Sequence, residues 1–171
     1  RRHAMSIKLD HLEKLYLSQL KDAYSAESQL LEALPKMRDA VSDEKLRGAF
    51  VDHLGETRNH VERLEKIFQS LNNKPGGQRC KAMEGLVKEG EEIMNEDGEP
   101  ATRDAAVICA AQKVEHYEIA TYGCLREYAR MLGYEEAADL LEQTLQEEKD
   151  ADGRLTALAE EWVNAAAMQD S

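Results

Sequence analysis

The chain contains four long stretches in which apolar residues recur every three or four positions, as they do along one face of an α-helix. No stretch shows the strict alternation that would indicate a β-strand. The pattern predicts four long helices: from about Ser6 to Ala40, from Asp43 through Phe68, from Thr102 or Asp104 through Met131, and from Gly133 to about Trp162.

Short turns join the predicted helices in pairs. Ser42 and Asp43 supply an N-cap directly after the first helix, and Gly133 suits the C′ position that ends the third. Helices joined by such short turns pack as antiparallel neighbours. Pro35 lies inside the first helix and lacks the amide hydrogen that would bond to the carbonyl of Leu31, so it predicts a kink.

The two predicted hairpins are separated by a long connection. Residues 72–77 read Asn-Asn-Lys-Pro-Gly-Gly and end the second helix, and Asp97–Pro100 breaks the chain again. Between them, Cys80 to about Asn95 predicts a shorter helix. The 34 residues from Gln69 to Thr102 are too many for a simple up-down-up-down bundle. An all-α, ferritin-like four-helix bundle requires such a crossover.

The length of 171 residues fits one domain. We expect residues 1–4 to be an expression scar, residues 5–166 to form the single helical domain, and residues 167–171 to fray. Three widely spaced cysteines indicate neither a disulfide framework nor a thiolate metal site, and Cys109 and Cys124 are expected to be small core residues. These features favour a reducing, cytoplasmic environment.

The charge balance narrows the range of partners. With 22 basic and 34 acidic residues, the net charge is −12, which repels nucleic-acid phosphates and anionic membrane surfaces. No apolar run approaches the roughly 20 residues that span a bilayer. We therefore expect no nucleic-acid or membrane partner. An acidic chain of this kind can instead gather cations.

Acidic residues occur at matched heights on the apolar faces of the two hairpins. Glu27 lies 15 residues before the first turn and Glu56 lies 14 after it, while Glu118 and Glu148 each lie 15 residues from the second turn. Carboxylates that face one another inside a bundle are costly unless a metal or a proton compensates them. The pattern therefore predicts a dinuclear metal site, although any one of these glutamates alone is more typical of a solvated helix face.

Further candidate ligands lie on the same helix faces, because they are spaced by three or four residues from these glutamates or from apolar positions. Oxygen-rich sites with a few imidazoles suit iron or manganese, and zinc remains an alternative. The predicted metal ligands are Glu27, His53, Glu56, His60, Glu115, Glu118, Glu148 and Asp152.

Four other residues lie near these candidates. Tyr24 and Tyr122 are one turn from predicted ligands, where they relay electrons or protons or simply fill the core. Arg58 and Lys149 pair with ligand carboxylates or face solvent.

Several segments together resemble the YciF/YciE family of bacterial ferritin-like proteins, over nearly the whole chain from Ile7 to about Ala159. The resemblance implies a ferritin-like bundle, a homodimer, a relation to rubrerythrin and an association with bacterial stress responses. The segments that carry it are His53–Thr57, Cys80–Leu86, Arg103–Ala106, Gln112–Ala120 and Glu147–Lys149.

The chain departs from the wider ferritin-like pattern at its histidines. That pattern places Glu-x-x-His on the second helix and often on the fourth, but here position 59 is Asn and position 151 is Ala. The imidazole of the second helix must then come from His53 or His60. The resemblance favours His53, because His60 is outside the family pattern. On the fourth helix, Asp152 replaces the missing histidine.

Three functions follow from these observations. The first is a dinuclear iron or manganese protein that acts on O₂ or peroxide in a stress response, as an oxidase or peroxidase. The absence of a Cys-x-x-Cys pair means that peroxidase turnover would need a separate reductant. The second is a metal-binding unit without turnover. The third is a structural or interaction bundle whose carboxylates are compensated by protons or basic side chains.

Overall fold

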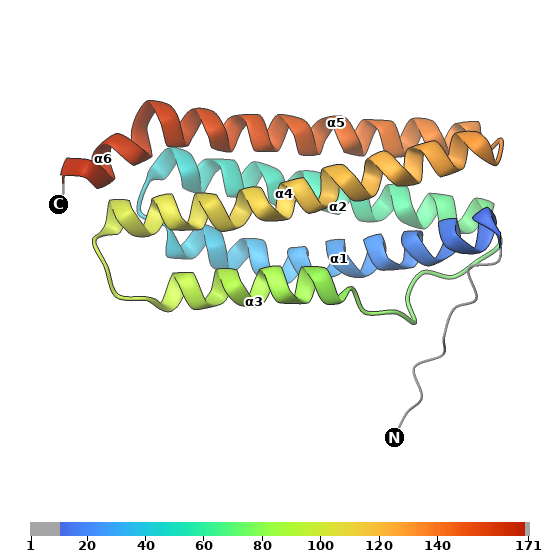
Figure 1. The fold of residues 1–171 in the computed structure, drawn as a ribbon, viewed down its shortest axis with the longest axis horizontal. Helices are drawn as coiled ribbons and strands as arrows, with labels where there is room; N and C mark the ends of the chain where they lie inside the picture. The colour runs from blue at the N-terminus through green and yellow to red at the C-terminus, as the bar shows by residue number, and fades with distance from the viewer. Residues whose placement is uncertain (1–10, 170–171) are drawn as a thin grey trace, which may run out of the picture.

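A computed structural model describes residues 11–169 and shows them as a bundle of helices with no β-strand (Figure 1). The expected scar at residues 1–4 lies outside the described residues. The helical elements are α1 (Leu12–Ala40), α2 (Glu44–Ser70), α3 (Lys81–Asn95), α4 (Pro100–Met131), α5 (Glu135–Leu158), a π-helical turn η1 (Ala159–Val163) and α6 (Asn164–Gln169).

The four long helices pair as the sequence predicts. Helix α1 packs along α2, and α4 packs along α5, each pair being joined by a short turn. The crossover between the hairpins contains α3, which lies against α1 and α4 (Figure 1). This arrangement confirms the all-α, ferritin-like bundle. Among residues 11–169, none of the helices combines the length and the apolar character that crossing a membrane would require.

The two hairpin turns have well-defined capping. The side chain of Asp43 accepts a hydrogen bond of 2.8 Å from the Leu46 amide, as expected of an N-cap. At the other turn, Gly133 has φ +77°, and the amide of Tyr134 reaches back to the carbonyl of Ala129 at 2.9 Å. This is the Schellman pattern that ends a helix on glycine. Both turns match the sequence prediction.

The beginning of α4 differs from the prediction. The helix begins at Pro100 and not at Thr102 or Asp104, because proline is well suited to the first helical position, where its missing amide costs nothing. Asp104 is a buried residue within the helix. Its carboxylate accepts hydrogen bonds from the amides of Ser42 at 2.9 Å and Asp43 at 2.8 Å. It thus ties the first hairpin turn to the second hairpin.

At the C-terminal end, helical structure extends beyond Trp162, through η1 and α6 as far as Gln169. The domain boundary expected at residue 166 stays a prediction. Residues 170 and 171 lie outside the described part. Val163 is buried in the apolar core, so the segment gains contacts that the amphipathic pattern alone did not reveal. Helix α1 is continuous through Pro35, which lies in its last two turns.

The apolar core is divided into two clusters. One is centred on residues such as Leu46, Phe50 and Ile108, and the other on residues such as Leu64 and Leu125. Between the two lies a layer of buried charged side chains.

Two of the cysteines are placed differently from the prediction. Cys109 and Cys124 are exposed, and Cys80 is the buried cysteine. The apolar stripe of α4 runs through residues such as Ile108 and Leu125, and Cys109 and Cys124 lie one position, about 100° of helix rotation, off these buried residues.

Candidate metal centre

The buried charged layer draws side chains from all four long helices. Glu27 comes from α1, His53 and His60 from α2, Glu115 and Glu118 from α4, and Glu148 from α5. Each of these residues is at most 5% exposed. The paired helices bring these positions to one height, as the spacing from the two turns predicts.

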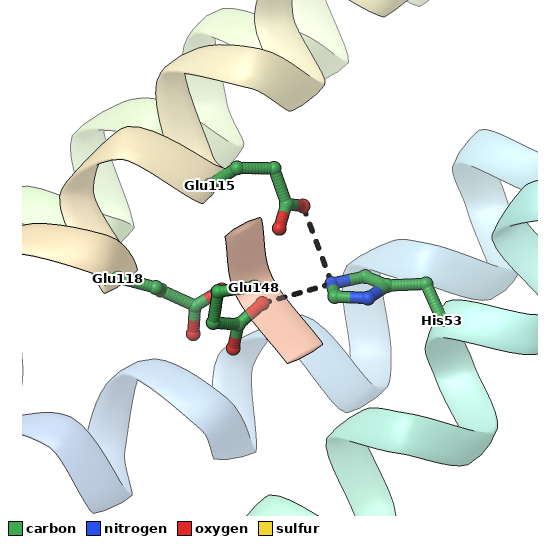
Figure 2. A group of neighbouring side chains, drawn as sticks. All are labelled: His53, Glu115, Glu118 and Glu148. Atoms are coloured by element: carbon green, nitrogen blue, oxygen red, sulfur yellow. Dashed lines mark ion pairs between the residues drawn. The ribbon is translucent and has the colours of Figure 1, made fainter. Parts of the chain in front are cut away.

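Within this layer, the potential ligand atoms form two groups that share one residue. His53, Glu115, Glu118 and Glu148 offer atoms within 4.8 Å of one another (Figure 2). Glu27, His60 and Glu148 form the second group. The first is called the His53 half and the second the His60 half. Glu148 belongs to both, so the two halves are adjacent.

The inner atoms of this cluster have no suitable hydrogen-bond partners. The Nε2 atom of His53 lies 3.2 Å from Glu115 Oε1, and Nδ1 of His60 lies 3.0 Å from Glu148 Oε1. These contacts have the distance of ion pairs but not the angles of hydrogen bonds. The orphaned buried atoms are Glu27 Oε2, His53 Nε2, His60 Nδ1, Glu115 Oε2, and both carboxylate oxygens of Glu118 and Glu148.

Such a concentration of unpartnered polar atoms is unusual in a protein interior, where nearly all buried polar groups are hydrogen-bonded. Divalent cations would satisfy these atoms and would neutralise the four carboxylates. The donor set of oxygen and imidazole nitrogen fits iron or manganese, and it also accommodates zinc. The residues present therefore fit a pair of metal ions.

The protonation of the cluster reflects the crowding of its charges. Burial, followed by the negative charges of Glu148 and Glu27, raises the pKa of Glu118 well above its ordinary value. Burial opposes protonation of His60, but Glu27 and the other surrounding carboxylates outweigh it and raise its pKa to about 12. Protons therefore occupy ligand positions in the metal-free protein.

His53 is oriented by a carboxylate on its outer side. Its Nδ1 atom lies 3.1 Å from Glu56 Oε2, and the same oxygen accepts a hydrogen bond of 2.7 Å from Arg154 Nη2. A carboxylate accepts hydrogen bonds, so the imidazole proton resides on Nδ1 whenever the ring is neutral. The lone pair of Nε2 then points into the cluster, where it is available to a metal.

His60 is oriented in the same way from a different helix. Its Nε2 atom lies 2.8 Å from Glu147 Oε2, and Arg63 binds both oxygens of Glu147 at 2.6 and 2.8 Å. Burial works against ionisation of Glu147, but the hydrogen bonds from His60 and Arg63 lower its pKa to about 2. This pairing leaves Nδ1 of His60 directed at the cluster.

Tyr122 adds a hydroxyl to the His60 half. It is 1% exposed, and its hydroxyl donates a short hydrogen bond to Glu27 Oε1. Its ring lies 6.2 Å from that of His60. Tyr24, the other tyrosine near the predicted ligands, instead donates to Glu65 away from the cluster.

Two predicted ligands lie outside both groups. Glu56 contacts His53 from behind, as described, and does not join the inner atoms. Asp152 accepts a hydrogen bond from Gln112 at 3.1 Å and lies 3.3 Å from His116. The structure thus brings together six of the eight predicted residues, and their metal binding remains a prediction.

The basic residues behind the cluster are not those that the sequence suggested. Arg58 and Lys149 face solvent, whereas Arg63 and Arg154 hold the two outer carboxylates. Arg63 lies three residues after His60, and that spacing was the signal available in the sequence. No such spacing singled out Glu147, because it directly precedes Glu148 and the direction of its side chain depends on how α5 is rotated about its axis.

Comparisons with known proteins agree with this architecture. The model of the family described as "Domain of unknown function (DUF892)" matches residues 11–168. Protein YciF of Escherichia coli (strain K12) is 48% identical over 157 residues, which cover 91% of this chain and 95% of YciF.

Solved structures share the fold. The crystal structure of the E. coli stress protein YciF aligns with a TM-score of 0.88 over 91% of this chain and 99% of that one. YcfI from Rhodopseudomonas palustris, proposed to be a structural protein, is 40% identical and aligns with a TM-score of 0.84, covering 90% and 96% of the two chains. The fold, the family match over residues 11–168 and the 48% identity to YciF all agree. This chain therefore belongs to the DUF892 family.

Proposed function

We propose that the buried layer binds two divalent metal ions, iron or manganese, and that the metal-loaded protein acts on O₂ or peroxide. The observation that carries this proposal is the set of unpartnered carboxylate and imidazole atoms converging from four helices. Side chains buried at such cost in a core, without hydrogen bonds, are readily explained by a cationic ligand.

The chain's residues divide the work between the two halves. His53, Glu115 and Glu118 would hold one ion and Glu27 and His60 the other, with Glu148 placed between them. When bound, a pair of redox-active ions supplies electron transfer to oxygen species together with Lewis acidity. The outer carboxylates of Glu56 and Glu147 hold the imidazoles in place, and the two apolar clusters keep bulk water away.

The relatives favour a role in stress. The E. coli relative is described as a stress protein, and it is nearly half identical to this chain over most of both sequences. An acidic surface and a metal pair that consumes O₂ or peroxide would suit protection against oxidants. We infer such a role here, in a homodimer located in the cytoplasm.

The proposal is tested by metal content and reactivity after anaerobic loading with Fe(II) and exposure to air. We expect two irons per chain and a visible absorption that appears on oxidation. Glu148→Gln should lose most of the iron because both halves use that residue, whereas Glu136→Gln, an exposed position on the same helix, should bind normally. A wild-type protein that takes up neither iron nor manganese would contradict the proposal.

A second candidate is a bundle that has kept the scaffold without turnover. The pKa values favour it in one respect: protonated Glu118 and charged imidazoles neutralise much of the cluster without metal. The proposed structural role of the Rhodopseudomonas relative points the same way. A melting temperature that does not change when metal ions are added, with no metal in the purified protein, would favour this alternative.

A further inference from the structure

A narrow hollow connects the surface to the His53 half. Its floor includes His53 and Glu115, both buried, while its rim includes Arg154, which is exposed, and Ala49, which is partly so. Ala151 of α5 lines the wall between them. Because this hollow is lined both by exposed residues and by buried residues of the His53 half, it leads from the surface to the cluster.

The hollow is small enough to select by size. It contains about 230 Å³ of space not occupied by atoms, part of it open to solvent, and its enclosed part has room for about one water molecule. A compact molecule fits with little rearrangement, whereas a ring or branched chain does not.

Arg154, one of the residues that line this hollow, forms an ion pair with Glu56. Arg154 Nη2 donates to Glu56 Oε2 at 2.7 Å, and the arginine side chain is 41% exposed. Exposed ion pairs contribute little stability, so the arginine can swing away at small cost. Glu56 remains held by His53, on the same carboxylate oxygen. The arginine is therefore the movable member of the pair.

The hollow does not reach the His60 half, since neither Glu27 nor His60 lines it. The His60 ring is fully buried, and Glu147 and Arg63 cover its outer nitrogen. Tyr122, also buried, covers Glu27. The two halves thus differ in how closely protein surrounds them, although their inner donor atoms are similar.

We propose that this hollow is the substrate entrance, and that it admits to the His53 half only molecules of up to about three non-hydrogen atoms, such as dioxygen or hydrogen peroxide. Arg154 is its movable cover. Organic peroxides with bulky groups are excluded. The inference rests on the proposed function, since it names the substrate class and the half of the cluster that receives it.

The test uses Co(II), whose visible absorption reports binding in the cluster, and azide, a linear anion of three atoms. Ala49→Leu and Ala151→Leu place bulk in the hollow, Arg154→Ala removes the cover, and Ala157→Leu is the control because Ala157 is exposed on the same helix. Cobalt content is measured first in every variant, and azide association is then followed by rapid mixing. Benzoate serves as the bulky probe.

We expect equal cobalt content in the wild type, both hollow-filling variants and the control. Azide should associate at least about tenfold more slowly in the filled variants, and several-fold faster in Arg154→Ala, because entry no longer waits for the side chain to move. Benzoate should not bind to the wild type. Ala49 is partly exposed, so Ala49→Leu keeps the test valid even if Ala151→Leu fails to fold.

The outcomes separate this inference from the proposed function. Normal cobalt content with the same azide rate in all folded variants would overturn the entrance and leave the metal site standing. Tight benzoate binding to the wild type would overturn the size limit. A wild-type protein that binds no cobalt, iron or manganese would overturn the proposed function and the entrance together.

Discussion

The two buried histidines obtain their orientation from opposite helices. Glu56, on the same helix as His53, is held by an arginine of α5, whereas the carboxylate behind His60 comes from α5 and is held by Arg63 of α2. Each imidazole therefore lies between a converging cluster and an anchored carboxylate. Outer partners of this kind fix the tautomer and raise the basicity of a ligating imidazole.

Removing the anchor should weaken metal binding without removing a ligand. We expect Arg63→Ala to lower the affinity for Mn²⁺ by about 10–100-fold, because Glu147 then loses the two hydrogen bonds that hold it against His60. Arg58→Ala, an exposed arginine on the same helix, is the control. Isothermal titration calorimetry measures the difference, and equal affinities would show that the anchor has no effect on the site.

At Glu118, the stability of the metal-free protein and the binding of metal should place opposite demands on the side chain. It is buried, both its oxygens are unpartnered, and its pKa is raised. We expect Glu118→Gln to stabilise the metal-free protein by about 1–4 kcal/mol near neutral pH, because the wild-type carboxyl must take up a proton on folding and the neutral amide need not. Chemical denaturation measures this change. The same variant should bind less metal, and a destabilised variant with full metal content would contradict both expectations.

At the scale of the helices, much of the architecture could be predicted from the sequence. The apolar spacing located the four long helices and α3, and the distances from the two turns placed Glu27, Glu118 and Glu148 at one height. These features depend on local periodicity and on helical rise, which a sequence contains directly.

The contacts around the ligands could not be predicted in the same way. Which residue faces inward at the edge of a helix depends on a rotation of a few tens of degrees, set by packing against the neighbouring helices. This explains why Glu56 stands behind His53 and why Arg63 and Arg154, not Arg58 and Lys149, hold the outer carboxylates. It also explains why Cys109 and Cys124 are exposed.

The hydrogen bonds by which Asp104 links the two hairpins give a prediction at the scale of the helices. Asp104 of α4 accepts hydrogen bonds from two amides in the α1–α2 turn and is 2% exposed. We expect Asp104→Ala to cost about 1.5–3 kcal/mol of unfolding free energy, since two amides of the turn lose a charged acceptor. Thermal and urea unfolding test this. An unchanged stability would show that solvent replaces the carboxylate, and Asp39→Ala, at an exposed position, is the control.

For the molecule as a whole, the charged layer links stability to pH. The raised pKa of His60, about 12, means that its stabilising contribution is complete below its unfolded value of 6.5 and is lost as pH rises towards 12. Glu118, whose pKa is also raised, acts in the same direction. Glu147, with a pKa of about 2, contributes above 4.5 and loses its contribution as pH falls towards 2.

The metal-free protein should therefore be most stable near pH 4.5, the unfolded value above which Glu118 begins to lose its contribution, and its melting temperature should fall as pH rises further. Added Mn²⁺ needs deprotonated ligands, so the stabilisation it provides should grow over the same alkaline range. Differential scanning calorimetry with and without metal tests both trends. A melting temperature that rises from pH 6.5 to 9 without metal would contradict the assignment of the cluster's charges.

The division of ligands between the hairpins also bears on how the chain folds. The α1–α2 hairpin carries both imidazoles and Glu27, and the α4–α5 hairpin carries only carboxylates. Neither hairpin alone contains a complete half of the cluster, and the long crossover delays their meeting. Ions would thus be captured only after the hairpins have docked. They would lengthen the lifetime of the folded protein by slowing its unfolding, and leave the rate of its formation almost unchanged.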